Sequence, residues 1–278
     1  MRNSWVTLGA LLACVIALGL FVWLKPPASK HVGNAVSTLK PANAQTLKVQ
    51  RKGKLLIALE KRDGQWLITA PFKAVADDFQ VLRLLAALEA RSITEYPASD
   101  AAKFELDTPQ AEILIDDQRF AFGAINNVTR EQYVLAGNRI VPLDPRFGAA
   151  IPTDAKSLLR RTLFAPGDTL QRFEFSNFSV AHDGKKWDIT PPVADISQDD
   201  SNRWVALWRD ASALRAELAD ARVPSGEIRV LLKSGAALNL AVIQTTPELI
   251  LRRADLGMQF VFTDEIGKQM LAPPIARK

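Results

Sequence analysis

Residues 63–71 read DGQWLITAP, and residues 183–192 read DGKKWDITPP. In both stretches the Asp-Gly pair predicts a tight hairpin turn, and the Trp-containing run after it predicts a strand. A mostly apolar run precedes each turn, at Leu55–Glu60 and at Phe173–Ala181, and predicts the other strand of each hairpin. The tryptophan stands five residues before the last proline in both copies. This shared spacing predicts that the body of the protein is a diverged tandem repeat.

Each hairpin is followed by a pair of aspartates that opens an amphipathic helix. The apolar stripe after Asp77-Asp78 contains Val81, Leu82, Leu85 and Leu88, and the stripe after Asp199-Asp200 contains Trp204, Trp208, Ala211 and Leu218. Residues at this spacing share one face of a helix. Aspartates at a helix start accept hydrogen bonds from unpaired N–H groups, so we interpret these acids as caps in preference to metal ligands.

Short strand-like runs separated by turn residues follow each helix. In the first copy they are Ala111–Ile115, Arg119–Phe122, Gln132–Leu135 and Arg139–Leu143, and in the second Glu227–Leu232, Ala237–Ile243, Glu248–Leu251 and Met258–Phe262. Asp144-Pro145 and Asp264 predict a short closing helix in each copy. The predicted class is α+β, with two tandem repeats that each contain a mostly antiparallel sheet and one main helix, after an N-terminal transmembrane helix.

The N-terminus predicts a membrane anchor. Trp5 to Leu24 is a run of 20 residues without a charge, the length that crosses a bilayer core as a helix. Interfacial tryptophans and the flanking Arg2 and Lys25 suit an uncleaved signal anchor. An alternative is that Cys14, in a lipobox-like Leu-Leu-Ala-Cys, is lipidated. We expect residues 1–25 to be the anchor, 26–44 a stalk, 45–164 repeat 1 and 165–278 repeat 2, with inner-membrane lipid as a partner and the body in the periplasm.

Composition excludes several classes of protein. The 278 residues are 48% hydrophobic and 23% charged, which fits a folded protein. The net charge of +5 comes mostly from residues 1–44, where four basic residues meet no acid; residues 45–164 hold 17 basic against 15 acidic residues, and 165–278 hold 14 against 15. That balance argues against nucleic acid binding. One cysteine and two distant histidines argue against a zinc centre, and we expect no cofactor.

Few residues suggest chemistry. His182-Asp183 could form a catalytic pair and Asp116-Asp117 an acid pair for glycoside hydrolysis, but each lies at a predicted turn. Arg160-Arg161 and Arg252-Arg253 are expected to be exposed. Four tryptophans are the candidate partner or ligand surface if they are exposed, although their positions suit a core: Trp66, Trp187, Trp204 and Trp208. No catalytic, cofactor or metal residues are predicted.

The order of motifs resembles a bacterial domain family of unknown function, family 4340. The resemblance is carried by Asp63–Trp66 through Pro71, the helix Asp77–Arg91, Phe104–Pro109, Phe122-Gly123, Gln132–Val134 and Leu158–Leu163. Glu105 stands where the family usually has glycine, and no glycine follows the Leu240 run in the second copy. Similar domains occur in membrane-anchored proteins, some beside auxiliary components of gliding-motility-type ABC transporters. The resemblance implies a fold and no established catalytic residues.

These observations predict a non-enzymatic accessory or scaffold protein of an envelope or ABC-type transport complex, with membrane or envelope proteins as partners. Two alternatives stay open. A binding module for a small molecule or glycan would have a pocket lined by Trp and Arg, and an acid-based hydrolase would have facing carboxylates in a cleft.

Overall fold

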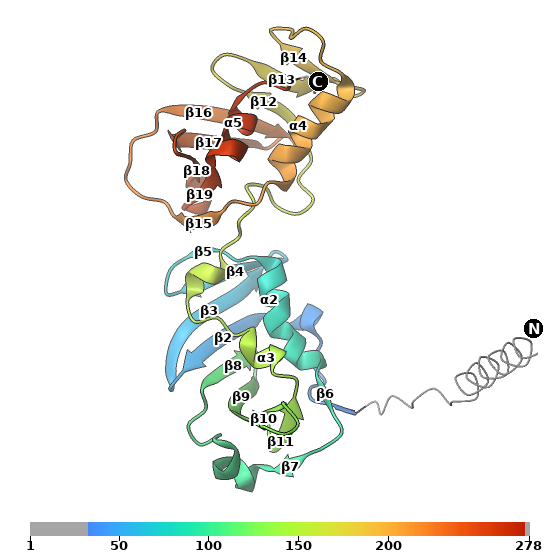
Figure 1. The fold of residues 1–278 in the computed structure, drawn as a ribbon, viewed down its shortest axis with the longest axis vertical. Helices are drawn as coiled ribbons and strands as arrows, with labels where there is room; N and C mark the ends of the chain where they lie inside the picture. The colour runs from blue at the N-terminus through green and yellow to red at the C-terminus, as the bar shows by residue number, and fades with distance from the viewer. Residues whose placement is uncertain (1–32, 276–278) are drawn as a thin grey trace, which may run out of the picture.

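The structure, a computed structural model, describes residues 33–275, which form two sheet-and-helix bodies stacked along the long axis of the molecule (Figure 1). The first body has a nine-stranded sheet and the second an eight-stranded sheet. A short pair of strands, β1 (Asn34–Ala35) and β6 (Arg91–Ser92), lies beside the first sheet. The paired strands run antiparallel, which confirms the α+β class.

The first sheet has the strand order β5-β4-β3-β2-β8-β9-β10-β11-β7. Its strands are β2 (Thr46–Arg51), β3 (Lys54–Arg62), β4 (Gln65–Ala70), β5 (Ala74–Val75), β7 (Tyr96–Pro97), β8 (Ala111–Ile115), β9 (Gln118–Ile125), β10 (Gln132–Ala136) and β11 (Arg139–Leu143). The hairpin at Asp63-Gly64 and the four predicted strands after the helix are confirmed. The central strand β2 was not predicted.

The second sheet has the strand order β14-β13-β12-β16-β17-β18-β19-β15. Its strands are β12 (Leu170–Glu174), β13 (Ser179–His182), β14 (Trp187–Thr190), β15 (Arg215–Leu218), β16 (Gly226–Leu232), β17 (Ala237–Gln244), β18 (Glu248–Arg253) and β19 (Met258–Thr263). When the short strand β5 is left out, the two sheets have the same strand order. The order β4-β3-β2-β8-β9-β10-β11-β7 in the first sheet corresponds to β14-β13-β12-β16-β17-β18-β19-β15 in the second. The single predicted strand Phe173–Ala181 is wrong, because the chain turns back between β12 and β13.

The main helix of each body begins close to its aspartate pair. Helix α2 (Asp78–Leu85) is capped by Asp77, whose side chain accepts from the Gln80 N–H at 3.1 Å, and the chain continues as the 3-10 helix η2 (Ala86–Glu89). Helix α4 (Gln198–Asp210) is capped by Ser197, and Asp200 completes a capping box. The cap interpretation is therefore confirmed for Asp77 and Asp200, whereas Asp78 and Asp199 lie in the first turns of their helices. The second helix begins at Gln198, before its aspartate pair.

The predicted stripe of the second helix is too long. Helix α4 ends at Asp210, and Leu218 lies in strand β15. The predicted closing helices are confirmed as α3 (Arg146–Ala149) and α5 (Asp264–Leu271). Four 3-10 segments besides η2 connect the other elements: η1 (Pro41–Asn43), η3 (Ala98–Phe104), η4 (Ala155–Leu158) and η5 (Ala254–Leu256).

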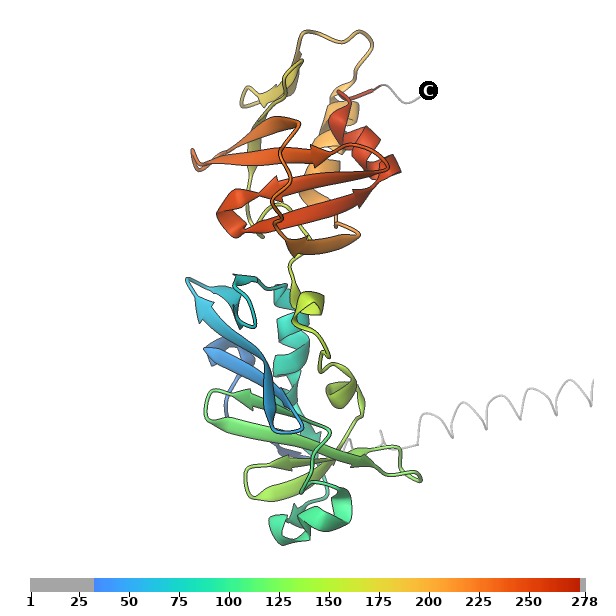
Figure 2. The same cartoon turned by 90° about the vertical axis from the view of Figure 1, so that its left-hand side faces the viewer.

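The helices cover one face of each sheet, α2 on the first and α4 with α5 on the second (Figures 1 and 2). The core lies between helix and sheet, and it continues from one body to the other through buried Leu158, Leu159, Leu163 and Phe164. A smaller apolar cluster packs η3 against the first sheet, where Leu106 contacts Ala121 and Ile140.

Two predictions concern the N-terminal part of the chain. The predicted spanning segment, Trp5 to Leu24, lies outside the described residues. Between residues 33 and 275 the structure contains no helix long and apolar enough to cross a membrane. Part of the predicted stalk contacts the first body: Val36 is buried and donates its N–H to the Ala90 carbonyl at 2.9 Å.

Candidate functional site

Residues 158–164, called the linker here, join the two bodies and hydrogen-bond to both. On the first body, Asp77 N–H donates to the Leu158 carbonyl at 2.7 Å, and Arg160 N–H donates to the Val75 carbonyl at 3.1 Å. On the second body, Ala213 N–H donates to the Arg161 carbonyl at 2.8 Å. Because the linker is paired on both sides, the two bodies hold a defined relative position.

Arg253 adds a side-chain bond from the second body to the linker. It is 5% exposed and donates from Nη1 to the Leu163 carbonyl at 2.5 Å, while its other nitrogens bind Asp255. Arg160 is 6% exposed, and within the described residues its Nε and one Nη have no hydrogen-bond partner. Burial, followed by repulsion from Arg253, lowers the pKa of Arg160. The prediction that these two arginines are exposed is wrong, because the junction covers them.

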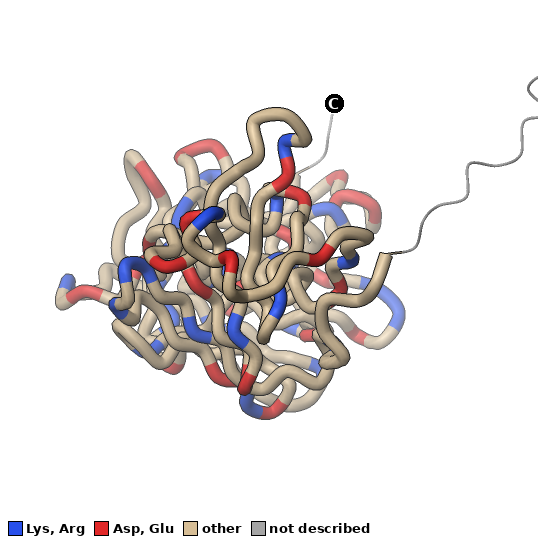
Figure 3. Tube along the Cα trace, turned by 90° about the horizontal axis from the view of Figure 1, so that it is seen from below, with Lys and Arg blue, Asp and Glu red and all other residues tan. Residues whose placement is uncertain are grey.

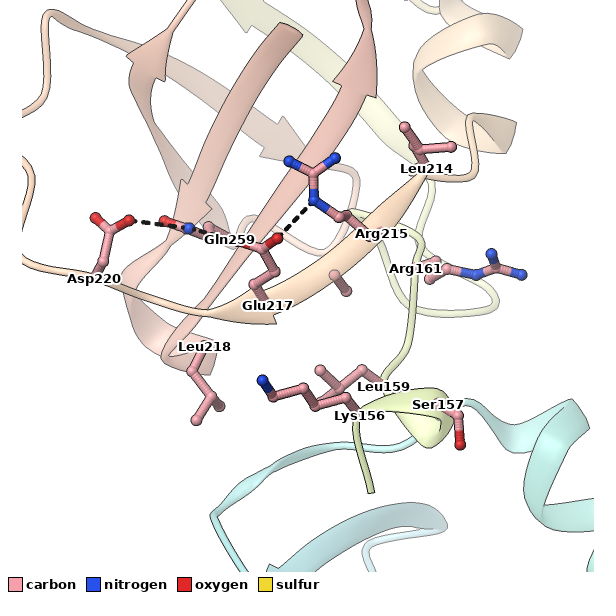
Figure 4. A pocket seen from close by; sticks show the side chains of 11 residues that line it. Lys156, Ser157, Leu159, Arg161, Leu214, Arg215, Glu217, Leu218, Asp220 and Gln259 are labelled. Atoms are coloured by element: carbon pink, nitrogen blue, oxygen red, sulfur yellow. Dashed lines mark hydrogen bonds and ion pairs between the residues drawn. The ribbon is translucent and has the colours of Figure 1, made fainter. Parts of the chain in front are cut away.

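A groove with a volume of about 680 Å³ opens beside the linker, between strand β15 and the 3-10 helix η4 (Figure 4). One wall is β15 with its neighbours, from Leu214 to Asp220 and Gln259, and the other is Lys156, Ser157, Leu159 and Arg161. The first wall belongs to the second body, and the other wall is formed by η4 and the linker itself. The position of the linker therefore shapes the groove.

Strand β15 is an edge strand. It pairs with β19, and no other described strand pairs with it. The linker meets the same edge just before β15 begins, where Thr162 forms a bridge with Ser212. The linker then leaves toward the first body, and the edge of β15 faces the groove.

The charged side chains on β15 are already paired with neighbouring strands. Arg215 binds Glu248 through two bonds of 2.8 Å and Glu217 through one of 2.6 Å. Gln259 donates to both Glu217 and Asp220 at 3.1 Å. These bonds hold the charges of β15 against its own sheet.

The two carboxylates of the groove are held in the ionised form. The hydrogen bond from Gln259, and then that from Arg215, lowers the pKa of Glu217. The side-chain bond from Arg222 is the largest cause that lowers the pKa of Asp220. A general acid needs a raised pKa to carry its proton near neutral pH, and the hydrogen bonds to both carboxylates act in the opposite direction. In residues 33–275 no group of three or more potential metal ligands was found.

The remaining surface of the groove is basic and apolar. Lys156 and Arg161 are exposed, and neither takes part in an ion pair among the described residues. Leu214 is 54% exposed and Leu218 is 38% exposed. In Figure 4, the Lys156 side chain points across the groove toward Leu218, whereas the Arg161 side chain extends away from the groove on the other side of the linker. The groove can therefore offer a cation, apolar side chains and a strand edge to a ligand.

The four tryptophans are buried. Trp66 on β4 is 4% exposed and Trp187 on β14 is 9% exposed, which confirms the prediction that matched positions form the core. On α4, Trp204 is 6% exposed and Trp208 is not exposed; their rings pack on Phe173 at 4.9 and 5.3 Å. Trp187 and Trp204 each lie at the edge of a surface hollow. The structure does not bring the four together into one surface.

The predicted acid and histidine candidates are turn residues in the structure. Asp183 accepts from the N–H groups of Lys185 and Lys186 at 2.7 and 2.8 Å, and His182 Nδ1 accepts from Gly184 N–H at 3.1 Å. Asp116 lies at the β8–β9 turn and accepts from Thr46 N–H at 2.7 Å. All three lie at turns, as the sequence predicted; His182 and Asp183 bind within their own turn, whereas Asp116 ties its turn to the start of β2.

Sequence reasoning missed the groove. Strand β15 reads RAEL, four residues with high helix propensity, so its composition hides an edge strand. The one available signal was Leu158–Leu163, which was noted only for its resemblance to a family pattern. Lys156 carries no signal of its own.

The fold and groove define an α+β protein of two antiparallel sheets joined by a hydrogen-bonded linker. Residues 66–220 match the family model described as a domain of unknown function, DUF4340. The match covers more than half of the chain, and the chain belongs to this family. It extends from Trp66 across the linker and β15 to Asp220, so it includes most of the groove. Neither a curated protein nor a solved structure matches the chain.

Proposed function

We propose that this protein is a non-enzymatic scaffold subunit of an envelope complex, anchored in the inner membrane by residues 5–24 with its body in the periplasm. The observation that carries the scaffold role is the linker, which is hydrogen-bonded to both bodies and thereby builds an open groove from two walls. A rigid frame with an exposed strand edge suits a protein partner. Glu217 and Asp220 in the groove both have lowered pKa values, so neither suits the general acid that an acid-based hydrolase needs.

We propose further that the two bodies arose by duplication. The supporting observation is the common strand order, with α4 placed directly after β12–β14 and α2 placed after the matching strands β2–β4 and the short extra strand β5. Matched places for Trp66 and Trp187 add to it. An experimental structure in which β2–β4 with β8–β11 failed to superpose on β12–β14 with β16–β19 would overturn the duplication.

An ABC-type transport complex is the first assembly to test, on the strength of the family resemblance in the sequence. Proteins and lipid are the proposed partners, and nucleic acid is not. Along the trace in Figure 3, basic and acidic residues are interspersed on the side shown, without the basic stripe that a phosphate backbone requires.

The test uses cell membranes that contain the full chain. We expect the protein to stay in the membrane pellet after a carbonate wash, and to be released when residues 5–24 are deleted. Alkaline phosphatase fused after Lys278 should be active, which is the result for a periplasmic C-terminus. On a native gel of detergent extracts, the chain should migrate in an assembly well above its own 30.6 kDa. Release of the wild type by carbonate refutes the anchor, and migration as a monomer refutes the scaffold role.

A second candidate function rests on a hollow of about 570 Å³ between α4 and α5. Its lining includes Arg203, Trp204 and Leu207 from α4 and Pro273 and Pro274 after α5. Trp and Arg together suit a small-molecule or glycan site. Against it, Trp204 is 6% exposed and uses its indole N–H to bind the Ala272 carbonyl at 2.8 Å. Glycan binding that is lost in Arg203→Ala would favour this candidate.

A further inference from the structure

Strand β15 has backbone groups that point into the groove. At its end, Ala219 N–H donates to the Gly257 carbonyl at 2.9 Å, and the register continues with Glu217 opposite Gln259. In an antiparallel ladder alternate residues direct their backbone groups to the same side. The backbone groups of Glu217 therefore face β19, and those of Ala216 and Leu218 face the groove.

The linker already begins a strand on this edge. Thr162 pairs with Ser212, and the Arg161 carbonyl accepts from Ala213 N–H. The preceding linker residues, 158–160, pair instead with residues 75–77 of the first body. The linker therefore diverges from β15 and leaves a wedge-shaped space between them. An added peptide segment could pair with β15 in this space and so extend the strand that the linker begins beside Ser212.

The space beside β15 suits one extended segment better than a folded sheet. The first body lies directly beyond the free edge, so a second copy of the chain cannot bring its own β15 alongside without meeting that body (Figures 1 and 4). The groove is partly open to solvent and is bounded by Lys156 and Leu159 on the far wall.

The chemistry of the walls indicates what the segment carries. Leu214 and Leu218 present exposed apolar side chains that a strand can cover. Arg215 and Glu217 are paired within their own sheet, so they leave little charge for a ligand. Lys156 reaches toward Leu218 and forms no ion pair among the described residues. Its charge complements a carboxylate.

We propose that the groove binds an extended peptide segment of a protein partner, which adds as a strand to β15 and places an acidic side chain on Lys156. Main-chain hydrogen bonds would provide affinity, and alternate side chains would provide specificity. This inference rests on the proposed scaffold function and names the site and the kind of partner.

The test uses a display library of random twelve-residue peptides and the full 278-residue chain purified in detergent. We expect enriched peptides to alternate apolar and acidic residues. Synthetic labelled copies should bind saturably by fluorescence anisotropy, and added salt should weaken the binding because Lys156 is exposed. Every second backbone amide of the peptide can be N-methylated in two ways, starting at an odd or at an even position. The set that places methyl groups on the amides facing β15 should abolish binding, and the other set should not.

Two variants and a matched control locate the binding. Leu218→Pro removes the N–H that faces the groove and leaves the bonds to β19, since proline is tolerated on the free side of an edge strand. Lys156→Glu reverses the charge of the far wall. Each should weaken binding by about tenfold or more, the scale of one lost buried hydrogen bond or ion pair. Lys185→Glu, at an exposed turn of the second body, should bind as the wild type does.

Thermal melts check that each variant is folded. If Leu218→Pro does not fold, the binding of Lys156→Glu and of the N-methylated peptides tests the proposal instead. Failure to enrich any peptide, or equal binding by Lys156→Glu, overturns the proposal. So does sedimentation showing a dimer that Leu218→Pro dissociates, because the occupant would then be a second copy. If the native-gel assembly persists while every peptide test fails, the scaffold role stands and the groove proposal falls.

Discussion

Replacing Gly123 by alanine tests how the first body is assembled. A Cβ at this position in β9 would lie 2.2 Å from the Phe104 carbonyl oxygen and 2.9 Å from the Leu106 side chain. Ordinary C···O contacts are about 3.3 Å or longer, so the backbone of η3 would have to move by about 1 Å. Gly123 thus permits η3 to pack against the sheet through Leu106.

The magnitude follows from two opposing effects. Overpacking against well-packed groups costs about 1 to 3 kcal/mol, and the upper end applies because the obstacle is backbone. Alanine has less conformational freedom than glycine in the unfolded chain, and this effect stabilises the folded protein by about 0.4 to 1 kcal/mol. We expect Gly123→Ala to lower the free energy of unfolding by about 2 kcal/mol.

The assay is urea unfolding of the full chain followed by far-UV circular dichroism. Gly226→Ala is the matched control, because a Cβ there meets nothing within 4 Å and the residue has no positive φ. The control should unfold at the same urea concentration as the wild type or slightly above it. If Gly123→Ala unfolds with the control, the close contact between η3 and β9 does not constrain the fold and the reasoning is refuted.

Three further predictions follow from buried or charged groups. Trp208→Ala should destabilise the protein by about 3 to 5 kcal/mol, because it empties a fully buried site and leaves the Met270 carbonyl without its 3.1 Å donor; a melt within 2 °C of the wild type would contradict it. Glu105→Gly should raise stability by about 1 kcal/mol, since Glu105 has φ +58° in the left-handed region that favours glycine, and a lowered urea midpoint would disprove this. Hydrogen bonds to Glu217, Asp220 and Asp255 lower their pKa values below the ordinary 4.5 and 3.8, so the stability they contribute is present above about pH 5 and is lost as the pH falls. Urea midpoints between pH 6 and pH 3 should therefore fall less steeply in the double variant Glu217→Gln/Asp220→Asn, and equal slopes would exclude the mechanism.

Local sequence signals predicted much of the fold. Asp63-Gly64 marked its hairpin because glycine adopts the positive φ of the turn, and short strand-like runs separated by turn residues marked β8 to β11. Asp77 was recognisable as a cap because its side chain acts within its own helix. These features depend on neighbours within a few residues.

The features that were missed depend on distant pairing. Strand β2 reads TLKVQR, in which only Leu47 and Val49 alternate with polar residues, and this short signal was overlooked; β3 and β8 pair with it on both sides. Leu218 in strand β15 was predicted as the end of a helix from its spacing after Trp208 and Ala211, but the strand pairs with β19. Burial of Arg160 and Arg253 also depends on how the two bodies meet.

The glycine positions explain a difference between the halves. In the first body, Gly123 lies under η3, and Glu105 at the end of η3 has the conformation that suits the glycine usual in the family. In the second body, Ala241 follows Leu240 and packs with Ile243, Ile250 and Val261. With a methyl group at that position, the second sheet fills its outer face with side chains where the first sheet accepts a 3-10 segment.

The linker also decides how the protein can be divided for study. A fragment that begins at residue 165 would lack the Arg161 carbonyl that binds Ala213 and the Leu163 carbonyl that binds Arg253. It would expose a strand edge and a cationic side chain that the intact chain satisfies, and such edges promote aggregation. A fragment that starts near residue 159 keeps those bonds, and is the better choice for expressing the C-terminal body alone.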